Sequence, residues 1–459
     1  MNEGASATSV GTPVHDQQRS SWDRRAMDWV LRTGPLERVG LERADWLFLA
    51  AVFLGSRLLI LALSLVATAI FPQIGPHGSF VYAPLGLPGQ DVLARLYAHF
   101  DSGWYIGISH GYFTPASGRP DWLVEWGFFP LYPLALHPVD FVLSLVPQPF
   151  NTGVLAGVLV SHAALFASMV LLFRLAAAEL SPAAARRTMV YLAAFPTSYV
   201  LSSVYPEGLF LLLTVGAFLA ARRRSWPVAG ILTALALLTR AQGLFLALPL
   251  LLEFAAAHHA AGHRWRDVRV LRGLWLVVPP IVALDGYALY SHAQTGYWLA
   301  FSVAQATLFG HRPTPPVYPL LRFVLAPQIG GPTSFDFGLA NFAGAVVFLA
   351  LTVVAWRRLP PAYTLWLALC VLFPLSTNGH NLSGFVRYMA PTFPAFLALA
   401  AWSLDEHWAP AGSAVETRAA PGRLAASARE LRDRLVLAPS LVFLAVWVIM
   451  FVNGYYGAA

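Results

Sequence analysis

The sequence FDSGWYIGISHGYF, residues 100–113, places a single aspartate among aromatic residues and glycines. A carboxylate can accept the proton of an attacking hydroxyl group, and an unperturbed aspartate is ionised well below neutral pH. Asp101 is therefore a candidate general base. A structural role is the alternative, because aspartate is a favoured N-cap and a helix is expected to begin at Ser102.

Two more charged residues lie beside long apolar segments, namely Glu207 and Arg240. A guanidinium presents two parallel N–H donors that suit a phosphate group. An uncompensated charge near a membrane is costly, which makes Arg240 a candidate functional residue. It is equally a candidate for a structural ion pair with Glu207, and both roles are compatible if Glu207 orients Arg240.

Composition predicts that membrane helices hold these residues. The chain has 459 residues, of which 57% are hydrophobic and 12% charged, and its mean hydropathy is +0.59. Soluble domains do not reach this value. The net charge of +7 comes from arginine alone, since the sequence contains no lysine. In membrane proteins such an excess reports loop orientation, so no nucleic-acid partner is expected.

We expect an all-α polytopic membrane protein with about 11 transmembrane helices. Residues 1–45 are polar and are predicted to form a cytoplasmic, partly disordered tail, and residues 46–455 a single membrane domain. Apolar runs of about 20 residues begin near residues 46, 152, 187, 209, 228, 244, 271, 339, 363, 388 and 435.

The arginines predict the orientation of this bundle. They cluster at residues 186–187, 222–224, 264–272, 357–358 and 418–434, and such clusters normally face the cytoplasm. This orientation makes 405–434 a cytoplasmic loop and places residues 72–150 and 293–338 outside. Asp101 then lies in a large first extracytoplasmic loop.

Two segments are ambiguous by length. Residues 226–257 are too long for one comfortable helix, so we predict a break near Gln242-Gly243 that gives two short spans. The sequence FFPLYPLALHPVDFVLSLVP, residues 128–147, could cross the membrane, but a crossing would send Arg174 and Arg186 outward. Its four prolines should also interrupt a helix. We predict a juxtamembrane or re-entrant segment.

Periodicity predicts a short helix after Asp101. Phe100, Trp104 and Ile108 recur every four residues, which fits an amphipathic helix lying in the membrane interface. Glycines at 103, 107 and 111 form a second stripe, which would let another backbone or a lipid approach closely.

FDSGWYIGISHGY followed by EWGFFPLYPLALHP resembles the first outer loop of the PIG-V family, which includes the second mannosyltransferase of GPI-anchor assembly and bacterial relatives. FPTSYVLSSVYPEGLF with the later LTRAQG is a second match, and RYMAPTFPAF a weaker third. The resemblance runs from about residue 45 to 455. The chain departs from the family pattern at His99-Phe100, Ser109, Pro206, Gly208 and Ala241-Gln242.

The resemblance implies a GT-C-type membrane glycosyltransferase with its active site outside the cytoplasm. Such an enzyme is an inverting, mannosyltransferase-like transferase. It moves a sugar from a polyprenyl-phosphate donor, such as polyprenyl-phosphate-mannose, to a glycan or glycolipid acceptor. It needs one base and a cradle for the leaving phosphate, but no cofactor or metal. We expect a multi-pass protein of the plasma membrane.

On this resemblance Asp101 is the catalytic base, and the remaining candidates form two groups. Those expected to bind the donor phosphate or sugar are Arg240, Glu207, Arg387, Tyr388 and Tyr205. Those expected to contact the acceptor or sugar are Trp104, Tyr105, His110 and Tyr112. Lipid-headgroup contact remains open for Arg387, interfacial anchoring for the aromatic rings and a structural role for His110. Arg57, within the first span, is expected to satisfy backbone carbonyls or a carboxylate.

A transporter or flippase of lipid-linked sugars is the alternative function. Transporters tend to contain internal repeats, and the sequence shows no second copy of the Asp101 or Glu207 segment. His259 and His263 have the spacing of metal ligands, but they lie in a basic loop with only Asp267 as a nearby carboxylate. We therefore expect no metal site.

Overall fold

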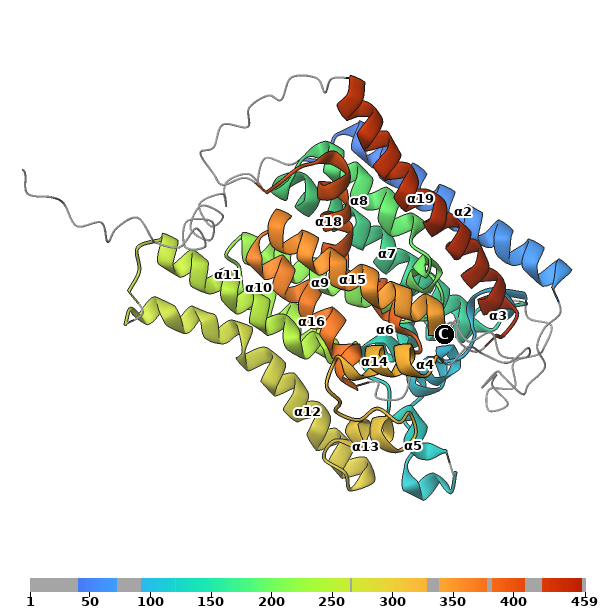
Figure 1. Cartoon of the computed structure of the whole chain (residues 1–459). Coiled ribbons are helices and arrows are strands. Elements are labelled where there is room, and N and C mark those ends of the chain that lie inside the picture. The colour runs from blue at the N-terminus through green and yellow to red at the C-terminus, as the bar shows by residue number, and fades with distance from the viewer. Residues whose placement is uncertain are drawn as a thin grey trace, which may run out of the picture.

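The computed structural model describes residues 40–71, 92–119, 121–147, 149–264, 266–327, 338–377, 382–408 and 423–455. All regular elements within these ranges are helices (Figure 1), in agreement with the predicted all-α fold. Most of the predicted tail, 1–45, and parts of the predicted loops 72–150, 293–338 and 405–434 lie outside the described residues.

Helices cover each of the apolar runs that the sequence predicted. The first half of the chain contains α2 (Arg43–Ile70), α3 (Val92–Tyr97), α4 (Ser102–Ser109), η2 (Pro115–Ser117), α5 (Trp122–Glu125), α6 (Leu131–Ser144), α7 (Thr152–Glu179), α8 (Pro182–Ala194), η3 (Ser198–Leu201), α9 (Glu207–Arg222) and α10 (Trp226–Leu237). The second half contains η4 (Ala241–Leu246), α11 (Ala247–Ala260), η5 (Val268–Leu276), α12 (Val278–Thr295), α13 (Ala300–Thr307), α14 (Tyr318–Leu325), α15 (Gly338–Arg358), α16 (Pro361–Thr377), α17 (Phe385–Met389), α18 (Phe393–Leu404) and α19 (Arg423–Val452).

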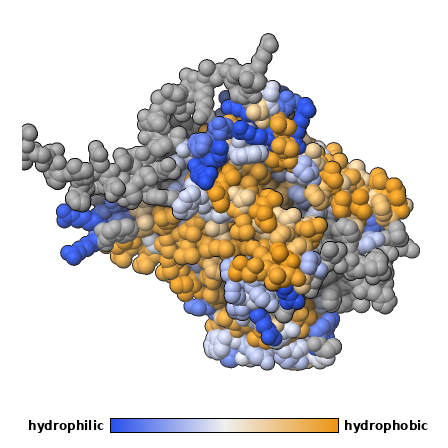
Figure 2. All heavy atoms as spheres, in the orientation of Figure 1, coloured by the Kyte–Doolittle hydropathy of each residue, from blue (hydrophilic) through white to orange (hydrophobic). Residues whose placement is uncertain are grey.

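Five helical segments of the described chain are long and apolar enough to cross a membrane: α2, α7, η4 with α11, α15 and α19. Three shorter helices, α10, α16 and α18, are also apolar. The protein is therefore a multi-pass membrane protein by helix length and composition, and much of the face in Figure 2 is hydrophobic. The total of about 11 spans stays a prediction, because α8, α9 and α12 are not among these segments.

The bundle has two ends that ion pairs distinguish. Glu207 begins α9 at one end, which we call the site end, where Arg240 pairs with it. Arg222 ends α9 at the opposite end, where its Nε lies 2.5 Å from Glu179 Oε1. The 16 residues of α9 separate these pairs by about 24 Å.

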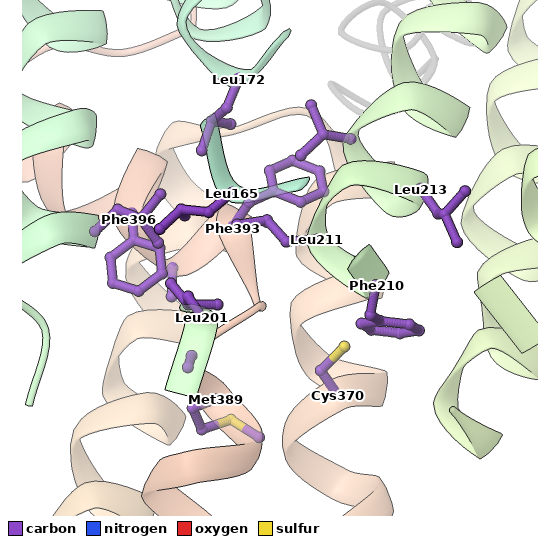
Figure 3. Packing of buried hydrophobic residues seen from close by; sticks show 14 of the residues in the cluster. Leu165, Leu172, Leu201, Phe210, Leu211, Leu213, Cys370, Met389, Phe393 and Phe396 are labelled. Atoms are coloured by element: carbon purple, nitrogen blue, oxygen red, sulfur yellow. The ribbon is translucent and has the colours of Figure 1, made fainter. Parts of the chain in front are cut away.

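The core between the two ends is built from α7, α9, α16 and α18. Figure 3 shows Leu165 and Leu172 of α7 near Phe393 and Phe396 of α18, with Cys370 of α16 in the same cluster. These side chains are buried, so the lone cysteine is a core residue. The packing fixes the helices whose ends carry the candidate residues.

The predicted break near Gln242-Gly243 is present. Helix α10 ends at Leu237, and the 3-10 turn η4 leads into α11. A Cβ atom on Gly243 would lie 2.3 Å from the backbone nitrogen of Leu237. Only glycine therefore lets η4 fold back against the end of α10, and this fold places Arg240 at the corner.

The prediction that prolines interrupt the 128–147 segment is wrong. Helix α6 runs continuously from Leu131 to Ser144 and contains Pro138. Pro130 and Pro133 lie at its cap and first turn, where a missing N–H costs no helical hydrogen bond. The helix packs on α4 and α7 and exposes Leu134 among its apolar residues.

Helix α4 begins at Ser102 as predicted, but it does not lie with one free face in the membrane interface. Tyr105, Ile106 and Ile108 are all buried in the protein. The predicted neighbour of the glycine stripe was a backbone or a lipid. At Gly107 the neighbour is a side chain, since a Cβ atom there would lie 3.2 Å from Glu125 Oε1. Helix α4 is thus a core element of the site end.

Candidate functional site

Four charged side chains from four separate segments meet at the site end, and we call them the charged cluster: Asp101, Glu207, Arg240 and Arg387. Arg387 lies at the centre. Its Nη2 is 2.7 Å from Asp101 Oδ2 and its Nε is 3.2 Å from Glu207 Oε1. Arg240 Nη1 approaches the same Glu207 oxygen to 2.5 Å.

The cluster balances its own charge. Two carboxylates face two guanidinium groups, as burial of charges requires. The side chain of Glu207 is 0% exposed, whereas that of Asp101 is 24% exposed. Asp101 is therefore the member of the cluster most open to a second molecule, and Glu207 is the anchor that the two arginines share.

Two tyrosine rings complete the surroundings of the arginines. The guanidinium carbon of Arg387 lies 4.8 Å from the ring centroid of Tyr205 and 5.5 Å from that of Tyr388. The guanidinium carbon of Arg240 lies 5.4 Å from the ring centroid of Tyr388. Cations are attracted to the faces of such rings, so the rings hold both guanidinium groups in place without neutralising them.

The backbone at Asp101 does not have the geometry of an N-cap. Asp101 adopts helical dihedral angles, φ −66° and ψ −17°, and its side chain makes no capping hydrogen bond. An N-cap residue normally has extended dihedrals and accepts from the first turn. The carboxylate turns to Arg387 instead. Phe100, just before it, has a positive φ of 53°, a strained conformation for a bulky residue.

Hydrogen bonds from the 198–205 segment hold the backbone that precedes Asp101. Val204 N donates to the Tyr97 carbonyl at 3.1 Å, and Tyr205 Oη donates to the His99 carbonyl at 2.9 Å. Tyr205 is buried, so its hydroxyl serves the backbone rather than an open surface. The structure therefore gives the Tyr205 hydroxyl a positioning role toward the Asp101 segment.

Arg57 anchors the same segment from α2. Its Nη1 donates to the Ser198 carbonyl at 2.9 Å and to Ser202 Oγ at 2.8 Å. This agrees with the expectation that a buried arginine in the first span satisfies backbone carbonyls. It fixes the turn that carries Tyr205 and Glu207.

The aromatic candidates of the first outer loop divide into packed and open rings. Tyr105 is buried and meets Phe128 and Tyr132 edge-on. Tyr112 donates its hydroxyl to the Phe128 carbonyl at 2.8 Å. Trp104 is only partly buried. Tyr112 is partly buried as well, so Trp104, three residues after Asp101, and Tyr112 both leave part of their surface open.

His110 lies apart from the charged cluster, at the far end of α4. Its Nε2 is 3.2 Å from Asp140 Oδ2 on α6, and its side chain is largely exposed. The contact ties the end of α4 to α6. The structure does not bring His110 together with the arginines.

Two polar residues of this region were not predicted as site residues from the sequence. Gln242 Oε1 accepts from Arg240 Nε at 3.0 Å, and so fixes the second edge of that guanidinium. Glu125 is buried and accepts from Phe113 N at 2.7 Å. Burial raises the pKa of the Glu125 carboxyl to about 7, while that hydrogen bond opposes the rise. In the sequence, the feature that could have pointed to Glu125 is its position directly before the aromatic residues of EWGFF.

Two buried oxygens at the site have no hydrogen-bond partner among the described residues: Glu207 Oε2 and Ser102 Oγ. Buried polar atoms normally bind protein, water or a ligand. Within the described ranges no group of three His, Cys, Asp or Glu side chains could hold a metal ion, and this includes the region of His259 and His263.

Comparisons with known proteins return distant structural matches only. No family model matches the chain and no curated protein matches it, so the PIG-V resemblance rests on the quoted motifs. An Archaeoglobus fulgidus oligosaccharyltransferase tethered to an acceptor peptide with the NVT sequon is 13% identical, with a TM-score of 0.43. The match covers 89% of this chain and 56% of that one.

A second solved structure gives the same picture. The archaeal oligosaccharyltransferase AglB from Archaeoglobus fulgidus, in complex with an inhibitory peptide and a dolichol-phosphate, is 13% identical with a TM-score of 0.42. The chain matches 56% of that structure, so it spans about half the length of the proteins it resembles. TM-scores this low assign neither a family nor an activity.

Proposed function

We propose that the chain is an inverting membrane glycosyltransferase of the GT-C type, mannosyltransferase-like, that uses a polyprenyl-phosphate sugar as donor. The observation that carries the proposal is the charged cluster, in which a partly open carboxylate adjoins two guanidinium groups. Base and phosphate cradle are the two groups that a single displacement needs. The quoted PIG-V motifs supply the sugar and donor class.

In the proposed reaction Asp101 accepts the proton of the acceptor hydroxyl as its oxygen bonds to the anomeric carbon. The bond between that carbon and the donor phosphate breaks, and polyprenyl phosphate leaves with the bonding electron pair. Arg240 and Arg387 offset the charge that develops on this phosphate. Guanidinium groups thus do the work that a metal ion does in other sites, and we propose that no metal or other cofactor is required.

The geometry of the charged cluster supports a proposed order of events. Arg387 pairs with one oxygen of Asp101 in the free protein, so the acceptor hydroxyl meets the other oxygen, Oδ1. A donor phosphate draws Arg387 toward itself, since a phosphate competes well for a guanidinium. The carboxylate then loses this ion pair and can accept a hydrogen bond from the acceptor hydroxyl when the donor is in place. We propose that Trp104, which is partly open and follows Asp101 by three residues, stacks on the sugar.

The site end faces away from the cytoplasm in this proposal, as the arginine-rich turns at the other end favour. The donor enters from the membrane with its head group at the outer interface. The acceptor is a glycan or glycolipid on the same side.

Transfer by the purified wild-type protein tests the proposal. Proteoliposomes are given polyprenyl-phosphate-[³H]mannose, and both labelled glycolipid and released polyprenyl phosphate are quantified. The proposal requires one polyprenyl phosphate released for each mannose transferred, with no effect of EDTA. Movement of intact donor between leaflets without release would favour the transporter alternative and overturn the proposal.

A further inference from the structure

The segment η5 joins α11 to α12 at the end of the bundle opposite the charged cluster (Figure 1). A 3-10 helix has three residues per turn, so side chains three apart align in rows. The first row of η5 consists of Val268, Leu271 and Leu274, which are 52–73% exposed. Three large apolar side chains therefore stand in one line on the surface.

The second row is Arg269, Arg272 and Trp275, all exposed. Arg264 and Arg266 precede η5 and are exposed as well. Asp267 is the acidic residue among them, and it caps η5 by accepting from Arg269 N at 2.9 Å. Four arginines against one carboxylate give this strip a net positive charge beside its apolar row.

The third row faces inward and holds η5 in place. A Cβ atom on Gly273 would lie 2.9 Å from a ring carbon of Phe254, so η5 sits directly on α11. A Cβ atom on Gly230 of α10 would lie 1.6 Å from the Trp275 carbonyl oxygen. With its backbone fixed this closely, η5 cannot rotate to bury the apolar row in the protein.

We propose that η5 is a binding surface for anionic lipid headgroups in the leaflet at the end of the bundle opposite the charged cluster. The apolar row lies among the upper acyl chains, Trp275 lies at the interface and the arginine row contacts lipid phosphates. Figure 2 shows hydrophilic residues at the edge of a broad hydrophobic face on this side of the molecule. This inference does not depend on the proposed transferase activity.

A probe on the apolar row tests both parts of the proposal. The full chain carries Leu271→Cys with Cys370→Ala, and a fluorophore on the new thiol is quenched in nanodiscs by spin-labelled phosphatidylglycerol or spin-labelled phosphatidylcholine. The phosphatidylglycerol should quench more strongly at equal mole fraction. Arg269→Gln with Arg272→Gln should reduce this preference by roughly fivefold for each arginine removed.

Two controls isolate the charge and the position. Arg269→Lys with Arg272→Lys keeps the charge and should keep most of the preference, while Arg434→Gln removes an exposed arginine of α19 and should leave it unchanged. Equal quenching by the two lipids in the parent protein would overturn the proposal. So would absence of quenching, which indicates a second copy over η5, or loss of the preference in inorganic phosphate, which indicates a free-phosphate site.

Discussion

Arg387 contacts both carboxylates of the charged cluster through different nitrogens, Nη2 toward Asp101 and Nε toward Glu207. One side chain thus links the partly open acid to the buried one. A planar guanidinium can do this because its donors are fixed in a fork, whereas an ammonium is a single point charge. The identity of this residue therefore matters beyond its charge.

The Arg387→Lys variant should still fold, but it should transfer sugar about a hundredfold more slowly. This is the typical effect of removing a positioned hydrogen-bond donor from a site where charge develops. Transfer from the polyprenyl-phosphate donor, measured at equal protein level, checks this. Arg434→Lys, on the exposed surface of α19, is the matched control and should behave like the wild type. Near-normal transfer by Arg387→Lys would show that only the positive charge of Arg387 is needed, for structure.

Glu125 gives the fold a dependence on pH. Burial raises the pKa of its carboxyl to about 7, above the ordinary 4.5. The unfolded chain then loses this proton at lower pH than the folded protein, so the contribution of Glu125 to stability is greatest at low pH and falls as pH rises through about 5 to 7. The loss should be about 2 kcal/mol and should level off above pH 7.

Thermal unfolding in detergent between pH 5 and 8 measures this dependence. Glu125→Gln keeps an acceptor for Phe113 N and cannot ionise. The variant should therefore show a smaller decline over the same pH range. A decline as steep as that of the wild type would assign the dependence to other groups.

Helix α9 brings Glu207 to the charged cluster. The next residue, Gly208, determines how closely the start of α9 packs against Leu201. A Cβ atom on Gly208 would lie 2.7 Å from the carbonyl oxygen of Leu201, which is backbone and cannot yield easily. A Cβ atom on Gly216, two turns further along, would lie 3.3 Å from the end of the Leu232 side chain, which can move.

Gly208→Ala should therefore displace the start of α9 and cost transfer activity, with a stability loss of about 1–3 kcal/mol from overpacking. Gly216→Ala, on the same helix, should be close to neutral because alanine also favours helix. Activity and thermal stability of both variants are compared at equal expression. Equal effects of the two substitutions would show that close packing at Leu201 does not position Glu207.

Elements were predictable from the sequence where apolar runs had clear limits. The break before α11 follows from local residues, Gln242-Gly243, and α4 begins at Ser102 as predicted, although Asp101 does not cap it. The interior of α4 was not predictable, because its apolar residues face protein rather than lipid and both environments select the same residues. The continuity of α6 was missed because all four prolines were counted as breakers, although Pro130 and Pro133 lie at the cap and first turn and the helix continues through Pro138.

Across the whole molecule, the sequence could name the members of the site but not their pairing. Asp101 and Arg387 are 286 positions apart, and no local pattern records that they touch. The sequence pointed to a pair of Arg240 with Glu207, and the structure shows that pair together with Arg387 on the same oxygen. Their convergence depends on how the helices pack, which only the folded chain shows.

The two ends of the bundle should face opposite sides of the membrane. In a Cys370→Ala background, Ala116→Cys in the first loop should react with an impermeant thiol reagent added to intact cells. Ala261→Cys, beyond the end of α11, should react only after permeabilisation. Both positions are exposed in the structure. Protection of position 116 together with labelling of position 261 would invert the proposed orientation.

Asp101→Asn tests the central claim most directly, because asparagine preserves the size of the side chain and an oxygen that can accept from Arg387, but it cannot take a proton from a hydroxyl. Membranes that carry the variant are assayed for transfer of mannose from polyprenyl-phosphate-mannose, with donor binding measured alongside. The account predicts retained insertion and donor binding, and transfer slower by about a hundredfold or more. Transfer at the wild-type rate would show that Asp101 is not the base.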